Sequence, residues 1–190
     1  MTLPNKLTVA RMAMVPIFVL FLMIPEIPLH YFWACLIFMV ASYTDHLDGM
    51  IARKQGLITT FGKFMDPLAD KVLVVTALVC FVRLDLCSVW FVILIIAREF
   101  TVTGVRLVAM ECGKVIAANK WGKLKTISQI IAVLAILVFQ SVEQFQQLSA
   151  GTVLSLTMIG NFLVGVCCFF TLFSGGIYLK ENWKIVSETK

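Results

Sequence analysis

The sequence predicts an all-α integral membrane protein with six transmembrane helices and a polar cavity open to the cytoplasmic side. Hydrophobic residues make up 60% of the 190 residues, whereas a soluble domain is typically about 45–50% apolar. The apolar residues form six runs, most of them close to the roughly 20 residues that a membrane-spanning helix needs. We expect residues 1–190 to form a single membrane domain.

The six spans follow from where the apolar runs begin and end. The first run, 8–24, is not followed by an A-x-A-like cleavage site, so we interpret it as a retained helix and not as a signal peptide. The outer halves of the first four spans are almost entirely Leu, Ile, Val, Phe and Met. The other spans are expected at 31–52, 66–83, 88–110, 126–143 and 152–179.

Basic residues are concentrated on one side of these spans. The odd-numbered connections contain Glu26, His30, Asp85 and Glu143, with Arg83 as the only strong base at an edge. By the positive-inside rule, we expect a multi-pass protein of the cell membrane with both termini in the cytoplasm. The bases of the termini and the even-numbered connections are Lys6, Arg53, Lys54, Lys63, Lys114, Lys120, Lys123, Lys125, Lys180, Lys184 and Lys190.

Four aspartates lie in the cytoplasmic parts of the second and third spans. Asp45 and Asp48 are three residues apart and Asp66 and Asp70 are four apart, so each pair lies on one helix face. Carboxylates near a bilayer are costly unless they are paired, hydrated or bound to a cation. Two helices that each offer two aspartates predict a site that gathers divalent cations.

The residues around these aspartates resemble a known family signature. The pattern D-x-x-D-G-x-x-A-R, followed by G-x-x-x-D-x-x-x-D, is similar to that of the CDP-alcohol phosphotransferase family. This chain supplies it with Asp45, Asp48, Gly49, Ala52, Arg53, Gly62, Asp66 and Asp70. The resemblance implies a six-helix homodimer that displaces CMP from a CDP-linked lipid with an alcohol. It also implies that Asp45, Asp48, Asp66 and Asp70 bind metal, and that Asp70 is the catalytic base.

The chemistry of such a transfer fits these residue types. Phosphoryl transfer depends mainly on positioning and on neutralising charge, and two cations can clamp a pyrophosphate donor. Carboxylate oxygens are suited to Mg²⁺ or Mn²⁺. A carboxylate that reaches the attacking alcohol can remove its proton. We therefore expect two divalent cations, Mg²⁺ or Mn²⁺, as cofactors.

A second set of residues is expected to contact the CDP-diacylglycerol donor. Arg53 offers a permanent charge that matches phosphate geometry, although a snorkelling interfacial charge is the alternative. The glycines suit a close approach of ligand or backbone, with ordinary helix packing as the alternative. Asn5 is also a possible N-cap, and Arg11 an interfacial anchor. Together with the charge of Arg53, the resemblance to the family implies that the donor contacts Asn5, Thr8, Asp48, Gly49, Arg53 and Gly62.

Four bases outside the shared motif are expected to hold the phosphate of the acceptor. Arg98 and Arg106 are eight residues apart, just over two helical turns, so they share a helix face. Lys123 and Lys125 begin the next span. The blocks R-E-x-x-x-x-x-x-R and G-K-x-K-T are similar to those of bacterial phosphatidylglycerophosphate synthases, which use glycerol 3-phosphate. A positive-inside loop and a snorkelling arginine are the alternatives.

The residues and their resemblance to the family together predict transfer of a phosphatidyl group from CDP-diacylglycerol to sn-glycerol 3-phosphate in a lipid bilayer, with no nucleic-acid partner. The homodimer is implied by the resemblance alone. A sister enzyme that uses serine, inositol phosphate or phosphatidylglycerol is the first alternative. A divalent-cation transporter is the rival from another class, although transporters commonly bind near the midplane between repeated halves. A structural membrane protein leaves the costly charges unexplained.

Overall fold

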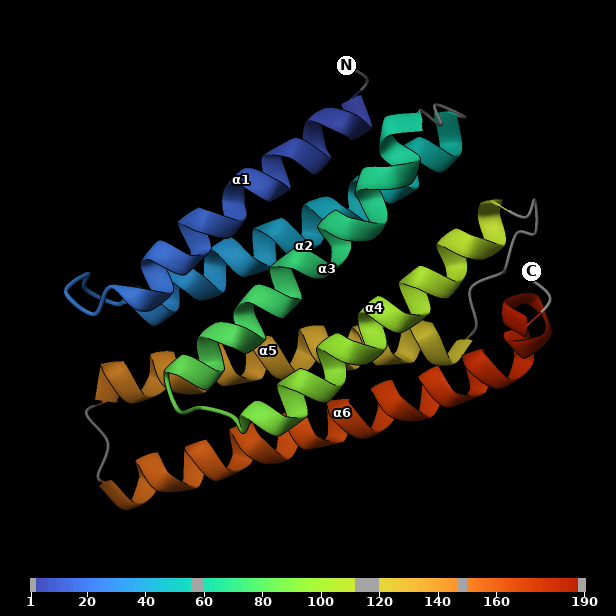
Figure 1. Ribbon diagram of the computed structural model, residues 1–190. Helices are drawn as coiled ribbons and strands as arrows, with labels where there is room; N and C mark the ends of the chain where they lie inside the picture. Colours follow the sequence, from blue (N-terminus) through green and yellow to red (C-terminus); the bar gives the residue numbers. More distant parts are fainter. Residues whose placement is uncertain (1–2, 56–59, 112–119, 147–149, 188–190) are drawn as a thin grey trace.

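The computed structural model describes the backbone of residues 3–55, 60–111, 120–146 and 150–187. It describes the side chains of residues 8–44, 71–109, 121–146 and 155–182. The described backbone forms six α-helices (Figure 1), which confirms the all-α class. They are α1 (Leu3–Met23), α2 (His30–Gln55), α3 (Thr60–Arg83), α4 (Val89–Glu111), α5 (Lys120–Gln146) and α6 (Ala150–Ser187).

Each expected apolar run forms one helix, and most helices extend beyond the run. α3 begins at Thr60, six residues before the expected span, and α6 continues to Ser187, eight residues after it. Helical hydrogen bonding continues into polar residues because Lys, Glu and similar side chains favour helix about as well as apolar ones. Apolar content therefore locates a helix better than it locates the helix ends.

The outer surface of the bundle is unusually apolar. Within the described part of the chain, Trp121–Gln146 and Ser155–Asn182 are long and apolar enough to cross a membrane, and Thr8–Met23 is a shorter apolar helix. Soluble monomers seldom expose large contiguous apolar patches, so this surface fits a protein surrounded by lipid. Exposed large side chains occur on every helix, for example Ile17, Met39, Val79, Trp90, Phe100, Ile131, Phe162 and Phe169.

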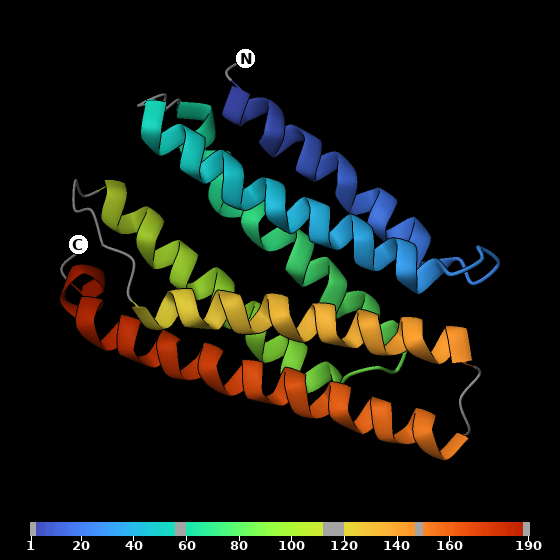
Figure 2. The same ribbon diagram turned by 180° about the vertical axis from the view of Figure 1, so that it is seen from behind.

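The helices pack around one apolar core. α1 packs against α2 and α3, α5 packs against α2 and α6, and α4 packs against α6 and α3 (Figures 1 and 2). The rings of Phe18 and Phe38 join α1 to α2 with centroids 5.8 Å apart. Other fully buried members of the core are Leu78, Phe81, Ile95, Leu137 and Val164.

The connection between α3 and α4 fixes the start of α4 against α6. Asp85 has a φ of 56°, and the Leu86 amide donates to the Phe81 carbonyl at 2.8 Å, which ends α3. The Ser88 amide then donates to Asn161 Oδ1 on α6 at 2.7 Å. This bond ties the first turn of α4 to α6, and it helps set how the rest of α4 lies along that helix.

One end of the bundle gathers the elements that carry most of the charged residues. The start of α1, the junction of α2 and α3, the end of α4, the start of α5 and the end of α6 lie toward the same end (Figure 1). The first and last helices therefore start and finish on one side, as an even number of antiparallel spans would require.

Candidate active site

A cavity of about 570 Å³ lies within the helical bundle. Each of the six helices contributes described residues to its lining, and α3, α4 and α5 supply most of them. Its apolar lining includes Leu73, Val74 and Ile95. Its polar and charged lining consists of Arg11, Ser42, Lys71, Arg98, Glu99, Thr103, Arg106, Lys123, Lys125, Thr126, Gln129, Ser174 and Tyr178.

The described lining of this cavity has a strongly unbalanced charge. Among the described residues that line it, six are basic and only Glu99 is acidic. Arg11 and Lys125 are only 2% and 5% exposed, so little water screens their charges. Buried like charges at short range repel one another, and an anion that enters the cavity relieves that repulsion. The described lining is therefore suited to bind an anionic group.

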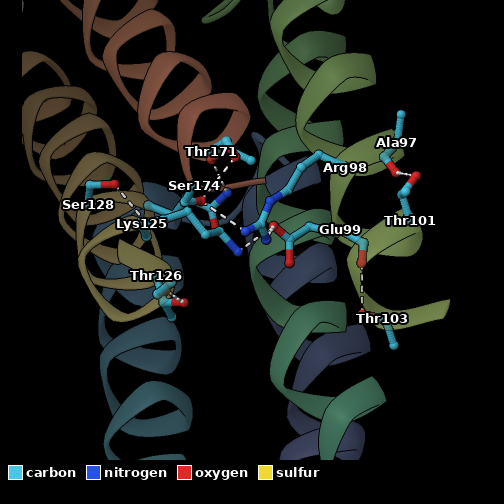
Figure 3. A network of polar contacts seen from close by, with 12 residues as sticks. Ala97, Arg98, Glu99, Thr101, Thr103, Lys125, Thr126, Ser128, Thr171 and Ser174 are labelled. Atoms are coloured by element: carbon cyan, nitrogen blue, oxygen red, sulfur yellow. Dashed lines mark hydrogen bonds and ion pairs between the residues drawn. The ribbon is translucent and has the colours of Figure 1, made fainter. Parts of the chain in front are cut away.

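Glu99 joins two of these bases in a buried network (Figure 3). Its Oε1 lies 3.1 Å from Arg98 Nη1 and also pairs with Lys125 Nζ. The carboxylate is 4% exposed, and its own backbone carbonyl accepts a hydrogen bond from Thr103 Oγ1 at 2.7 Å. A buried carboxylate between two bases lowers the cost of burying both. Glu99 thus links α4 to the start of α5.

α6 supplies the other side of the network. Arg98 Nη2 donates to Ser174 Oγ at 2.9 Å, and that hydroxyl donates to the Thr171 carbonyl at 3.1 Å. Gln129 Nε2 on α5 donates to Thr171 Oγ1 at 3.3 Å. These contacts join α4, α5 and α6 around one guanidinium (Figure 3). The bonds to Glu99 and Ser174 restrict its orientation, because they fix two nitrogens of the same planar group.

Arg106 lies two turns further along α4 beside Tyr178. Its Cζ is 6.0 Å from the centre of the Tyr178 ring. Arg106 Nε and the Tyr178 hydroxyl are buried and have no hydrogen-bond partner among the described residues. Buried donors that lack a protein partner indicate an unseen one, and here they adjoin the cavity. A ligand with several acceptor oxygens, such as a phosphate, would satisfy them.

The structure brings together all four bases that we expected at the acceptor. Arg98, Arg106, Lys123 and Lys125 line the same cavity. Lys123 is exposed, whereas Lys125 is buried and paired with Glu99. These placements disfavour a purely surface role for Arg106 and Lys125, because a snorkelling or loop base would extend into solvent.

The expected donor residues are only partly described. Thr8 is buried, 3% exposed, and it is not among the described residues that line the cavity. Arg11, one turn later, does line it and is 2% exposed, so it is not an interfacial anchor. Outside the described side chains lie Asn5, Asp45, Asp48, Gly49, Arg53, Gly62, Asp66 and Asp70.

The backbone places the four aspartates on α2 and α3, the two helices that meet at one junction. Asp48 lies seven residues before the end of α2 and Asp66 six residues after the start of α3; Asp45 and Asp70 each lie ten residues from those ends. The two helices therefore carry their acids at matching distances from the same junction, and hard carboxylate donors suit Mg²⁺ or Mn²⁺. Among the residues whose side chains are described, no group of three or more His, Cys, Asp or Glu could hold a metal.

Sequence reasoning missed several residues of the cavity. Lys71, Gln129, Ser174 and Tyr178 all line it, and none was expected there. Thr171, Ser174 and Tyr178 recur every three or four residues within 162–179, where the other residues are apolar or glycine, so they share one helix face. That stripe was a usable signal, because polar side chains inside a membrane helix tend to face the protein interior.

Known proteins are similar to this chain over most of its length. The family model for CDP-alcohol phosphatidyltransferase matches residues 1–173. A Bacillus subtilis (strain 168) protein named CDP-diacylglycerol--glycerol-3-phosphate 3-phosphatidyltransferase is 44% identical over 98% of both chains. A Rickettsia bellii (strain RML369-C) protein of the same name is 35% identical over 94% of this chain and 93% of its own length.

A third relative covers less of the chain. It is a Mycobacterium tuberculosis (strain ATCC 25618 / H37Rv) protein named probable phosphatidylglycerophosphate synthase, 42% identical over 69% of this chain and 63% of its own length. A family model that matches nearly the whole chain agrees with the motif of aspartates and with a cavity suited to anions. On these grounds, the chain belongs to the CDP-alcohol phosphatidyltransferase family.

Proposed function

We propose that this protein transfers the phosphatidyl group of CDP-diacylglycerol to sn-glycerol 3-phosphate, giving phosphatidylglycerophosphate and CMP. The observation that carries the proposal is the basic cavity in which Arg98, Arg106, Lys123 and Lys125 meet. The relatives in Bacillus and Rickettsia bear the name of this activity. Because one fold can host many reactions, the choice of glycerol 3-phosphate rests on the charge of the site and not on the fold.

The charge of the cavity favours a phosphorylated acceptor. Serine is a zwitterion without net charge, so it gains little from an excess of basic side chains. Glycerol 3-phosphate brings a dianionic phosphate that Arg106 and Lys123 can bind, because no described carboxylate pairs with either of them. Arg98 and Lys125 add charge to the same site while Glu99 holds them in place. Charge-assisted bonds of this kind are the strong ones.

Described neighbours support a role for the aspartates at this cavity. Ser42 lies three residues before Asp45 on α2, and Val74 lies four residues after Asp70 on α3; both line the cavity. Residues at these spacings share a helix face. We assign Asp45, Asp48, Asp66 and Asp70 as ligands of two divalent cations, Mg²⁺ or Mn²⁺. When bound, these cations would neutralise the pyrophosphate of the donor.

Donor and acceptor would then meet inside the bundle. The glycerol 3-phosphate hydroxyl attacks the phosphorus that carries diacylglycerol, the bond to CMP breaks, and Asp70 accepts the hydroxyl proton. Arg11 lies one turn after Thr8 on α1 and lines the cavity, which supports a donor site at this helix. The residues proposed to contact the donor are Asn5, Thr8, Asp48, Gly49, Arg53 and Gly62.

The arrangement in the membrane is part of the same proposal. The protein would have six spans and form a homodimer. Both termini and the mouth of the cavity would lie on the cytoplasmic side, so a lipid donor could enter from the inner leaflet. Single cysteines at Lys180 on α6 and at Glu26 in the first connection, both exposed, test the orientation. An impermeant thiol reagent applied to intact cells should label only Glu26→Cys. Light scattering of the purified protein should give twice the mass of one chain.

A release assay for CMP separates the proposed function from its rivals. Purified protein would receive CDP-diacylglycerol and Mn²⁺ with glycerol 3-phosphate, serine, inositol phosphate or phosphatidylglycerol in turn. We expect rapid CMP release with glycerol 3-phosphate only. Release with another acceptor would identify a sister enzyme. An absence of CMP release with every acceptor, together with cation flux into vesicles, would favour a divalent-cation transporter.

A further inference from the structure

Arg98 lies unusually close to the backbone of α6. A Cβ added to Gly175 would lie 2.8 Å from Arg98 Cγ and 3.0 Å from Arg98 Nε. Real Cβ atoms do not approach other heavy atoms that closely, so any larger residue would displace the arginine or the helix. Gly175 is buried inside α6. A glycine in the middle of a helix is less stable than alanine by about 1 kcal/mol, which is consistent with a need for this close approach.

The residue beside Gly175 binds the same arginine. Ser174 Oγ accepts a hydrogen bond from Arg98 Nη2 at 2.9 Å. The serine hydroxyl donates its own proton to the Thr171 carbonyl at 3.1 Å, which leaves its lone pairs directed at the guanidinium. Ser174 therefore fixes the end of the Arg98 side chain, and Gly175 gives room to its stem. Figure 3 shows Arg98 extending from α4 toward Ser174.

The neighbouring glycine provides an internal contrast. Gly176 is exposed, and a Cβ added to it would meet nothing within 4 Å. Two adjacent glycines in one helix thus have different surroundings, and only Gly175 contacts a residue of the cavity. A need for flexibility in α6 would explain both glycines equally. Close packing against Arg98 explains only Gly175.

We propose that Ser174 and Gly175 are positioning residues that set Arg98 for the phosphate of the acceptor. This inference rests on the proposed function, because it takes Arg98 to be part of the acceptor site. Glu99 holds the other face of the guanidinium through Nη1 at 3.1 Å. The arginine is therefore clamped between its own helix and α6. Ser174 and Gly175 thereby limit where the remaining N–H groups of Arg98 can point.

The test compares Gly175→Ala with Gly176→Ala in the full-length protein. KM for glycerol 3-phosphate and KM for CDP-diacylglycerol would be measured by CMP release. Gly175→Ala should raise KM for glycerol 3-phosphate by about ten-fold, because small misplacements at a binding site have large effects, and it should leave KM for the donor unchanged. Gly176→Ala should change neither. Equal KM values for glycerol 3-phosphate in both variants would overturn the positioning role.

A double variant shows whether Gly175 acts through Arg98. Arg98→Ala removes the side chain that the new Cβ would meet, so Gly175→Ala should cause no further loss in that background. Multiplied losses would mean that Gly175 acts elsewhere and would overturn the proposal. If Gly175→Ala alone does not fold, the double variant should fold again. Failure of both to fold would likewise overturn it.

Two further results separate this inference from the proposed function. Ser174→Ala should raise KM for glycerol 3-phosphate by about five-fold, since one hydrogen bond to a charged group is lost, with KM for the donor unchanged. If the parent protein releases no CMP with glycerol 3-phosphate, the proposed function fails. If Arg98→Ala leaves KM for glycerol 3-phosphate unchanged while the parent uses that acceptor, only the inference about Arg98 and its clamp fails.

Discussion

The apolar core and the basic cavity are stabilised in different ways. In the core, Phe18, Phe38 and Phe81 are fully buried among aliphatic side chains. Close packing of apolar surface is sufficient to stabilise them there. In the cavity, Arg98, Glu99 and Lys125 are almost as deeply buried but carry charge. Burial alone stabilises a phenylalanine, whereas a buried charge is tolerated only with a partner.

This difference separates stability from activity within one bundle. A residue of the core contributes to packing, and its loss leaves a void. A base of the cavity contributes to binding an anion, and its loss removes repulsion from its basic neighbours as well as an attraction to the ligand. We therefore expect core substitutions to alter the free energy of unfolding and cavity substitutions to alter kinetic constants. Four experiments, given in order of decreasing effect on activity, can contradict or support that expectation.

Removal of divalent cations should have the largest effect on activity. Excess EDTA should abolish CMP release, because the proposed site relies on cations to neutralise the donor pyrophosphate. Added Mg²⁺ or Mn²⁺ should restore it. Thermal unfolding in EDTA should show that the apolar core remains intact. Full activity in metal-free buffer would contradict the proposed metal site.

Asp70→Asn should have the next largest effect. The amide keeps the size of the carboxylate but cannot accept the proton of the attacking alcohol, so turnover should fall by about 100-fold or more. Binding of CDP-diacylglycerol should persist. The matched control is Asp85→Asn in the connection between α3 and α4, where the residue is exposed and its φ of 56° suits asparagine.

The dependence of turnover on pH gives a second measurement for Asp70. If the asparagine variant retains turnover near that of the parent, with the same pH profile, another group removes the proton. A similar loss in Asp85→Asn would show that the assay reports damage to the fold. Either result would weaken the assignment of Asp70 to the chemistry of the cavity.

Arg106→Ala should reduce kcat/KM for glycerol 3-phosphate by about ten-fold or more. A hydrogen bond to a charged group contributes roughly 1.5–3 kcal/mol, and 1.4 kcal/mol corresponds to a factor of about ten. Plain glycerol lacks the phosphate, so it should be a poor acceptor that loses little further activity in this variant. Arg83→Ala provides the control, because Arg83 is exposed at the last residue of α3.

The two alcohols decide what Arg106 does. Equal losses with glycerol and with glycerol 3-phosphate would indicate a structural role or a role in donor binding. Such a result would also weaken the distinction between the apolar core and the basic cavity, since a cavity residue would then be needed for packing. Its contact with the Tyr178 ring makes this alternative worth measuring.

Phe38→Ala should have the smallest effect on the kinetics of the folded protein and a large effect on its stability. Truncating a buried phenylalanine typically costs about 3–5 kcal/mol, so the unfolding midpoint should fall sharply. KM for both substrates should stay at the parent values in the fraction that remains folded. Phe169→Ala is the control, because Phe169 is 66% exposed and leaves no cavity. A change of KM in Phe38→Ala without a loss of stability would refute the separation.

Much of the fold could be predicted because it depends on local composition. Each apolar run formed a helix. Lipid offers no hydrogen-bond partners to the backbone N–H and C=O groups, so a segment in lipid must pair these groups within itself. The eight-residue spacing of Arg98 and Arg106 correctly placed both at one cavity. The helix ends were less accurate, as α3 and α6 show, because helix formation does not stop where apolar residues stop.

Composition and spacing along the chain suffice to predict the class of the protein, the six helices and a set of charged residues too costly to be incidental. Only the tertiary structure decided that Glu99 joins Arg98 to Lys125 and that α6 clamps Arg98 through Ser174 and Gly175. The physical reason is separation along the chain. Periodicity within a helix reports which residues share a face, but the partner that meets that face comes from another helix. Ser174 is 76 residues from Arg98 along the chain, and only packing brings the two together.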